Sequence, residues 1–122
     1  MTSVCTGSLL LAAAGLLKGY KATSHWAFTE LLPMFGAEPT EGRVVIDRNR
    51  ITGGGVTAGI DFGLTLVSEI CGEQVAKEIQ LGLEYDPHPP FRCGHPSVAD
   101  PAMVASVKKR LLGLVKGMES QP

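Results

Sequence analysis

The residue best suited to nucleophilic chemistry is Cys5, which lies between a polar, β-branched lead-in and a run of strong helix formers over 9–14. A strand that turns sharply into a helix at a reactive side chain is a nucleophile elbow, described for serine in Gly-x-Ser-x-Gly. Here the trailing half of that pattern is kept as Cys5-x-Gly7, with Ser3 in place of the first glycine. Gly7 is expected to permit tight packing of the helix on the strand. The alternative is a small buried core cysteine, which is what most free cysteines are.

An elbow would change the chemistry of Cys5 through its backbone surroundings. The sulfur would project from the carboxyl edge of a sheet, against the positive end of a helix that begins at Thr6 or Gly7, and this favours a thiolate. Free backbone N–H groups around the turn could also hold negative charge that develops on a bound substrate. The pattern therefore indicates a cysteine nucleophile at a helix amino terminus.

His25 and Trp26 follow the next expected strand and are candidates for lining the same site. A histidine near a cysteine can act as the base of a Cys–His pair. The alternative is that His25 is only packed and hydrogen-bonded beside Trp26 at the end of a strand. Both alternatives stay open on the sequence alone.

The segment Gly53–Gly55 begins another candidate part of the site. It lacks the lysine and the spacing of a phosphate-binding loop, so close backbone packing near the cysteine, through Gly54, is the expectation. Thr57 is placed to cap the helix that follows. Asp61 is expected to interact with the dipole of that helix or to support the site, rather than to take part directly in catalysis.

Composition excludes several classes of function. The formal net charge of −1 and the absence of a long basic run do not suggest a nucleic-acid partner. The longest apolar run, 9–17, is too short to span a bilayer and resembles no signal peptide, so a soluble, cytoplasmic protein is expected. The three cysteines are widely spaced and favour neither a disulfide framework nor zinc, and His88 and His95 are too loosely spaced for a metal pair. No metal or cofactor is expected.

The elements that must position these residues begin with a helix over 7–14 and a strand over 21–24. Strand, helix and strand make one right-handed crossover unit. Next, 27–34 carries apolar residues on a helical stripe, and Gly36 ends it.

After a turn-rich connector, 43–47 is rich in β-branched residues and turns tightly into 50–53, which predicts a hairpin or a bent return strand. Apolar residues at helical spacing then predict one helix over 58–70 and another over 73–83. A glycine joins these two helices.

The chain changes character after residue 85. Most of its proline falls within 86–101, which predicts an extended arm in place of regular structure. A helix is expected over 102–117, with Asp100 as its cap, and residues 118–122 should be frayed. The sequence thus divides into 1–85, the arm and a final helix.

Four stretches together give a family resemblance: the elbow, 22–26, 51–61 and 80–87. On these residues the chain resembles the ThiJ/PfpI superfamily, and within it the bacterial isocyanide hydratases. The Val56–Asp61 signal also occurs in amidase-like domains of some AraC-type regulators, but no helix-turn-helix domain follows here. The resemblance implies an α/β, flavodoxin-like three-layer sandwich with a mainly parallel sheet. Only the carboxyl-terminal part of that domain is expected in residues 1–122.

The resemblance also implies a reaction and site residues. Isocyanide hydratases are lyases that add water to an isocyanide through a cysteine thioimidate, so Cys5 would be the nucleophile and Thr6 the neighbour that lines the site. The carboxylate partner of the cysteine would lie in the missing portion, which would impair this chain. A homodimer and a small electrophilic substrate are implied. A non-catalytic or redox-sensing regulatory domain and a glyoxalase- or hydrolase-like enzyme remain alternatives.

Overall fold

The computed structural model describes residues 1–119. Its internal contacts divide the chain into two units, Met1–Asp86 and a second unit that begins at Pro87. Among the described residues, all the strands and the cysteine elbow belong to the first unit, whereas the second unit contains α4 (Pro101–Glu119). The candidate site is therefore built within the first unit.

The larger sheet of the first unit has the order β1 (Thr2–Ser3), β5 (Arg50–Gly53) and β4 (Val44–Asp47). β1 pairs with β5 in parallel, with Thr2 opposite Ile51, and β4 pairs with β5 in the antiparallel sense. The β4–β5 connection is the predicted hairpin. Its turn passes through Arg48, whose φ of 53° is left-handed.

The smaller sheet pairs β2 (Lys21–Ala22) with β3 (Glu38–Pro39) in parallel. β1 and β2 were expected to share one crossover unit, but they lie in different sheets. Just beyond β2, the Thr23 N–H donates to the hydroxyl of Thr52 in β5, at 2.9 Å, and not to a backbone carbonyl. A side-chain hydrogen bond thus links the two sheets where a ladder bond was expected.

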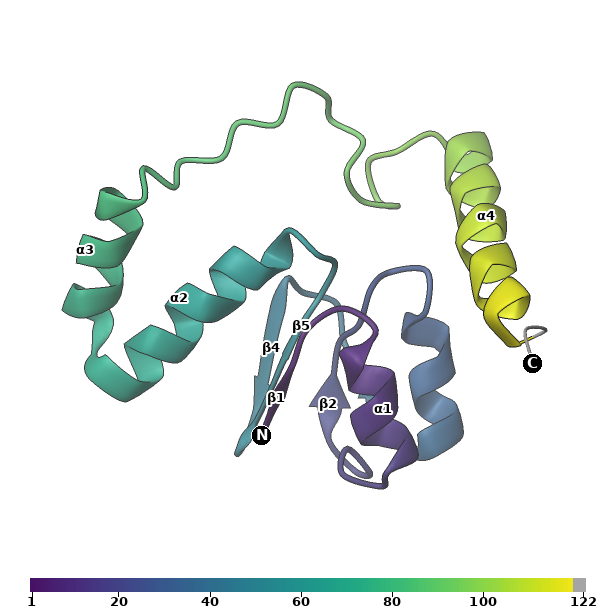
Figure 1. Cartoon of the computed structure of the whole chain (residues 1–122), viewed down its shortest axis with the longest axis horizontal. Helices are drawn as coiled ribbons and strands as arrows, with labels where there is room; N and C mark the ends of the chain where they lie inside the picture. The colour runs from purple at the N-terminus through teal and green to yellow at the C-terminus, as the bar shows by residue number, and fades with distance from the viewer. Residues whose placement is uncertain (120–122) are drawn as a thin grey trace. The chain divides into compact units, whose positions relative to one another are not determined.

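Helices cover the larger sheet from both sides. α1 (Gly7–Ala13) contacts β1 and the 3₁₀ helix η1 (Thr29–Phe35), whereas α2 (Ala58–Cys71) contacts β4 and β5. In Figure 1, α1 and α2 accordingly lie on opposite sides of the strands. This is the layered arrangement that the resemblance implied.

One helical segment differs from the sequence expectation, and Pro33 explains the difference. The segment expected as a helix over 27–34 is a 3₁₀ helix that contains Pro33. Proline has no N–H to donate to an i−4 carbonyl, so the tighter turn is favoured there. Gly36 ends η1 in the left-handed conformation, as expected.

The core beneath α1 and η1 consists of small and branched side chains, namely Ala12, Leu17, Ala22, Leu32 and Ala37.

α2 and α3 (Glu73–Gly82) meet at Gly72, where the sequence predicted a break. The φ of 93° at Gly72 is one that glycine adopts readily and other residues do not.

In the second unit, the carboxylate of Asp100 accepts hydrogen bonds from the N–H groups of Ala102 (2.8 Å) and Met103 (3.3 Å), so the predicted cap is present. α4 continues beyond the expected 117 to Glu119. The predicted fraying of 120–122 lies outside the described residues.

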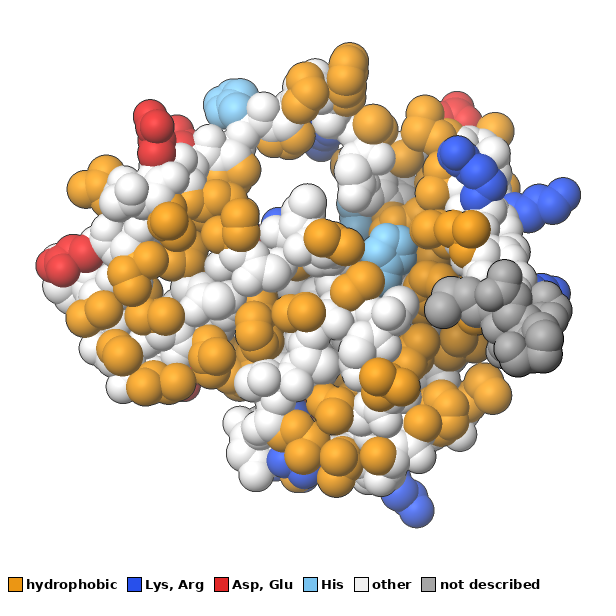
Figure 2. Space-filling view, in the orientation of Figure 1, with side chains coloured by type: hydrophobic (Ala, Val, Ile, Leu, Met, Phe, Trp, Pro, Cys, Tyr) orange, Lys and Arg blue, Asp and Glu red, His pale blue; other side chains and the backbone are white. Residues whose placement is uncertain are grey.

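Many apolar side chains remain exposed, as the orange atoms in Figure 2 show. The most exposed large ones in the first unit include Leu10, Met34, Val56, Ile70 and Leu81. Within residues 1–119, no helix combines the length and apolar character needed to cross a membrane. The exposed apolar surface is consistent with the 44% hydrophobic content of the chain.

Candidate active site

The elbow at Cys5 is a sharp turn between β1 and α1. Cys5 has a φ of 53°, a left-handed conformation that is uncommon for a residue with a side chain. β1 ends at Ser3 and α1 begins at Gly7, so the turn is as short as a nucleophile elbow requires. The half-buried cysteine therefore lies at the amino terminus of α1.

Hydrogen bonds from both sides hold the Cys5 backbone in this conformation. Its N–H lies 2.8 Å from the carbonyl oxygen of Gly54 and 3.1 Å from that of Gly53. Its own carbonyl accepts from the hydroxyls of Ser24 (2.9 Å) and Ser8 (3.2 Å). Sequence reasoning missed both serines. Ser8 could have been found from its i+3 spacing, whereas Ser24 is distant in sequence.

The first turn of α1 leaves a donor available beside Cys5. Within residues 1–119 the Thr6 N–H makes no hydrogen bond, and Thr6 itself is exposed. This N–H can point at a negatively charged oxygen or nitrogen bound near the cysteine. Gly7 was expected to permit tight packing of α1 on β1, and a Cβ there would lie 3.6 Å from Cβ of Ser3, an ordinary contact. The contact alone does not require glycine.

His25 lies beside the glycine loop but does not bond to the cysteine. A Cβ added to Gly55 would lie 3.4 Å from Cδ2 of His25, so the ring packs against this loop. Nδ1 of His25 accepts a hydrogen bond from the Ala27 N–H at 3.2 Å, which leaves Nε2 as the available nitrogen. Burial lowers the pKa of His25, so its neutral form is favoured. Among the described residues, no hydrogen bond joins His25 to the sulfur of Cys5.

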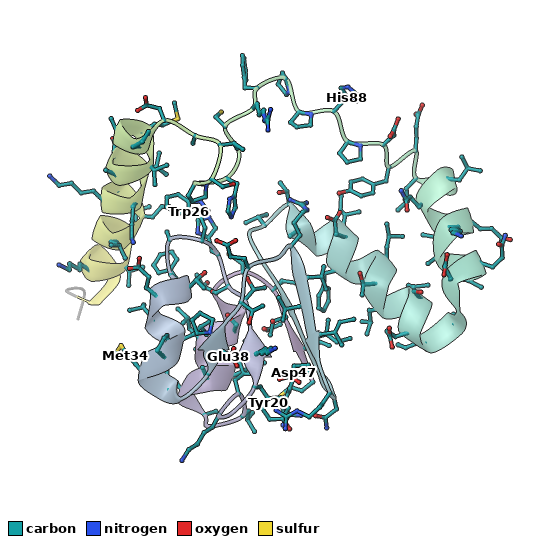
Figure 3. The ribbon with its side chains drawn as sticks, turned by 180° about the vertical axis from the view of Figure 1, so that it is seen from behind. Tyr20, Trp26, Met34, Glu38, Asp47 and His88 are labelled. Carbon is teal, nitrogen blue, oxygen red and sulfur yellow. The ribbon has the colours of Figure 1, made fainter. Side chains whose placement is uncertain are left out.

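Trp26 completes an aromatic group with His25 and Phe28. The ring centroid of Trp26 lies 5.6 Å from that of His25, and the ring centroid of Phe28 lies 5.9 Å from that of His25. Figure 3 shows Trp26 at the opposite end of the strands from Tyr20 and Asp47. The aromatic side chains are thus at the end where β2 finishes.

Thr57 occupies the expected N-cap position of α2, but its hydroxyl makes no capping hydrogen bond. Instead, its backbone carbonyl accepts a hydrogen bond from Nη2 of Arg43 at 3.1 Å. Arg43 thereby fulfils part of the anchoring that the sequence assigned to the threonine side chain.

Asp61, in the first turn of α2, is the acceptor of two side chains. Nε of Arg43 pairs with its Oδ2, and the hydroxyl of Tyr85 donates to its Oδ1. Burial raises the pKa of Asp61, but the hydrogen bonds from Arg43 and Tyr85 outweigh this and leave the pKa below its ordinary value. Asp61 is therefore an ionised partner of Arg43 rather than a proton donor. Neither Arg43 nor Tyr85 was identified from the sequence.

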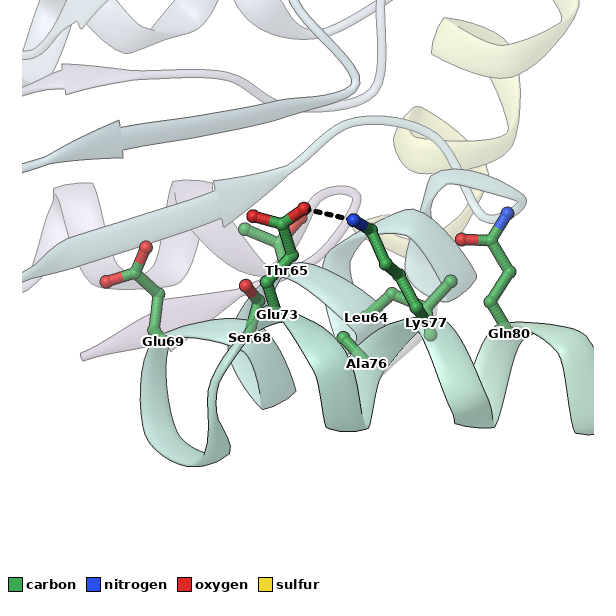
Figure 4. A pocket seen from close by; sticks show the side chains of 8 residues that line it. All are labelled: Leu64, Thr65, Ser68, Glu69, Glu73, Ala76, Lys77 and Gln80. Atoms are coloured by element: carbon green, nitrogen blue, oxygen red, sulfur yellow. Dashed lines mark ion pairs between the residues drawn. The ribbon is translucent and has the colours of Figure 1, made fainter.

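In the part of the chain that the structure describes, neither a metal site nor a second pocket adds to the elbow. Within residues 1–119, no group of three or more His, Cys, Asp or Glu side chains could hold a metal ion. A shallow cavity of about 300 Å³ lies between α2 and α3, and the Glu73–Lys77 ion pair crosses part of it (Figure 4). None of its lining residues belongs to the elbow, so it is separate from the Cys5 site.

Comparison with known proteins places the elbow in a family context. A profile of the DJ-1/PfpI family matches residues 1–69. The chain is 57% identical over 110 residues to the isonitrile hydratase of Pseudomonas putida, covering 90% of this chain and 48% of the hydratase. It is 44% identical over 78 residues to the HTH-type transcriptional regulator CdhR of Pseudomonas aeruginosa, covering 61% of this chain and 23% of the regulator.

A solved structure gives the corresponding comparison of folds. A THiJ/PfpI family protein from Pseudomonas syringae superposes with a TM-score of 0.82 and 57% identity, covering 95% of this chain and 46% of that protein. The chain thus spans about half the length of the hydratase and of this structural relative. The expected α/β, flavodoxin-like fold is confirmed. With its cysteine elbow and this match over 1–69, the chain belongs to the DJ-1/PfpI family.

Proposed function

We propose that this chain is part of an isocyanide hydratase-like lyase in which Cys5 is the nucleophile. The observation that carries the proposal is the 57% identity with the Pseudomonas putida isonitrile hydratase over 110 residues, and the sharp left-handed turn at Cys5 supports it. The elbow supports it because a thiolate at a helix amino terminus is well placed to attack an electrophilic carbon.

The reaction proposed at this site adds water to an isocyanide. The Cys5 thiolate attacks the terminal carbon of the isocyanide, and a proton is added to that carbon to give a thioimidate. Water then adds to the same carbon, the C–S bond breaks, and the products are an N-substituted formamide and the free cysteine. One isocyanide and one water molecule thus give one formamide, with no change in oxidation of the sulfur.

Each neighbouring residue has a proposed role in these steps. The Thr6 N–H and hydroxyl stabilise charge beside the reacting carbon, and Nε2 of His25 faces the site. Trp26 and the loop that contains Gly54 and Thr57 line it, with Gly7 at the start of the helix. The family resemblance implies that the proton donor is a carboxylic acid outside these 122 residues. Asp61, which pairs with Arg43 and has a lowered pKa, is not proposed for this role.

Isocyanide hydration with formamide detection tests this proposal. The assay compares the 122-residue chain with the same chain joined to the part of the Pseudomonas putida hydratase that it does not match. Cys5→Ala is the test variant, and Cys71→Ala, at an exposed cysteine, is the matched control. Activity in the joined form that is lost only with Cys5→Ala is expected. A joined protein that folds but forms no formamide, or one that stays active with Cys5→Ala, would contradict the proposal.

A second candidate is a non-catalytic regulatory domain, which the similarity to an HTH-type transcriptional regulator favours. In that case Cys5 would bind or sense a small molecule without turnover. A folded joined protein whose Cys5 is alkylated or oxidised readily, but which converts neither isocyanide nor methylglyoxal, would favour this candidate.

We also propose a homodimer with a small-molecule substrate, in a reducing cytoplasmic setting. The exposed apolar side chains of the first unit support self-association, and the free cysteines are typical of a reducing compartment. Sedimentation velocity should show a dimer, whereas a monomer at all concentrations would argue against the assembly.

A further inference from the structure

Arg43, which precedes β4, makes side-chain contacts to two parts of α2. Its Nη2 donates to the Thr57 carbonyl at the start of the helix, at 3.1 Å, and its Nε pairs with the carboxylate of Asp61 one turn later. The hydroxyl of Tyr85, which follows α3, donates to the other oxygen of Asp61. The side chains of Arg43, Asp61 and Tyr85 therefore form one hydrogen-bonded group.

The backbone of Arg43 is connected to the elbow by two consecutive hydrogen bonds. The Gly54 N–H donates to the Arg43 carbonyl at 2.8 Å, and the Gly54 carbonyl accepts from the Cys5 N–H at 2.8 Å. The path therefore runs from Cys5 through Gly54 to Arg43, and from there to Asp61. Gly54 is buried, so neither of its bonds is readily replaced by water.

The segment that these bonds fix is conformationally permissive. Gly53, Gly54 and Gly55 are consecutive, and glycine loses more backbone entropy on ordering than any other residue. Such a segment keeps one conformation only if the surrounding structure holds it. Arg43 holds it on both sides, through its carbonyl at Gly54 and its guanidinium at Thr57.

The other anchors of the elbow act at a different atom. Ser8 and Ser24 hold the carbonyl of Cys5, whereas Gly53 and Gly54 hold its N–H. Loosening the glycine segment would therefore free one side of a residue that already has an unfavourable left-handed backbone.

We propose that Arg43 and Asp61 are positioning residues that keep the Cys5 thiol aligned with the amino terminus of α1. The inference rests on the proposed function only in treating Cys5 as the reacting group. Tyr85 contributes by fixing the carboxylate that Arg43 needs. An ionised Asp61 is consistent with this arrangement.

The test measures cysteine alkylation by iodoacetamide at pH 7 in the 122-residue chain, site by site, by mass spectrometry. The exposed Cys71 and Cys93 are internal controls in every sample. Asp61→Asn should slow alkylation of Cys5 severalfold and leave the control cysteines unchanged, because a less fixed elbow presents the sulfur in one orientation less often. Hydrogen exchange at the Cys5 amide should become faster by a similar factor, since its acceptors are less fixed.

Matched variants separate positioning from general stability. Glu73→Gln removes the same charge from an ion pair on α3, with Lys77, and should leave Cys5 unchanged. Tyr85→Phe removes one hydroxyl and should have a smaller effect in the same direction as Asp61→Asn. Arg43→Lys keeps the charge but not the paired donors, and should resemble Asp61→Asn.

The proposal is overturned if Asp61→Asn or Arg43→Lys folds and keeps the wild-type ratio of Cys5 to Cys71 alkylation and the wild-type exchange at the Cys5 amide. If both variants fail to fold, Tyr85→Phe decides by the same two measurements. Because no isocyanide is used, a negative result here is distinct from a negative result for hydratase activity.

Discussion

His25 is the residue whose protonation should affect stability near neutral pH. Its pKa is lowered by burial in the folded state, and the ordinary value of about 6.5 applies to the unfolded chain. Between the lowered value and about 6.5, the unfolded chain therefore binds more protons, and stability falls as the pH decreases through this range.

Urea unfolding at pH 7.5 and at pH 5.5 measures this difference. The wild-type chain should lose more stability on acidification than His25→Gln, whereas His88→Gln, at an exposed histidine, should behave as wild type. Equal losses in the wild-type chain and in His25→Gln would contradict the assignment.

The sequence identified the reactive end of the site better than the residues that support it. Cys5 and its helix follow from local order along the chain, and so does the neighbouring glycine segment. Ser24 and Arg43 could not be predicted, because they act on Cys5 and Thr57 from positions distant in the sequence. The roles proposed in catalysis or in lining the site all stay predictions, for Cys5, Thr6, Gly7, His25, Trp26, Gly54, Thr57 and Asp61.

At the scale of elements, two helix starts allow a direct comparison. The carboxylate of Asp100 caps α4 through two N–H groups, whereas the hydroxyl of Thr57 makes no capping bond to α2. Asp100→Ala should therefore destabilise α4 by about 1 kcal/mol. Thr57→Ala should change stability by less than about 0.5 kcal/mol.

Circular dichroism at 222 nm during thermal unfolding measures both variants. The Asp100→Ala chain should begin to lose helical signal at a lower temperature than the wild-type chain. The Thr57→Ala chain should not. Equal effects of the two substitutions would show that the hydroxyl of Thr57 acts as a cap in solution.

Prediction of elements succeeded where the signal was local. The β-branched run before Arg48 gave the hairpin, and Gly72 gave the break between α2 and α3. β3 was missed because Glu38–Pro39 has no strand signal and pairs only because Tyr20 and Ala22 offer their carbonyls. A helical stripe gave the position of η1 but not its 3₁₀ geometry, which Pro33 favours.

At the scale of the whole molecule, the segment that spans the boundary of the two units should be the first to be cleaved. Residues 83–100 contain no helix or strand, and Arg92 within them is exposed. Limited digestion with trypsin should therefore cut first after Arg92, giving fragments that correspond closely to the two units.

Mass spectrometry of the early digest identifies the site. Arg92→Gln should delay the first cleavage severalfold, and Lys109→Gln, within α4, should not. Initial cleavage inside α2 or α3 would contradict the assignment of these helices to one stable unit.

The family and the fold class were predicted from the resemblance that the elbow and the stretches 22–26, 51–61 and 80–87 carry, and both are confirmed. The division of strands between two sheets was not predictable. β2 pairs with β3, and the bond from the Thr23 N–H to the hydroxyl of Thr52 joins residues far apart in the sequence, so neither contact has a local signal.

The left-handed backbone at Cys5 has a thermodynamic consequence. Glycine adopts this conformation without the steric penalty of about 1 kcal/mol that a side chain incurs. Calorimetry should therefore find a higher melting temperature for Cys5→Gly than for Cys5→Ala, and equal values would mean that the turn relaxes. If Cys5→Gly also melts above the wild-type chain, the cysteine side chain is kept at this turn at a cost in stability, as the proposed nucleophile would require.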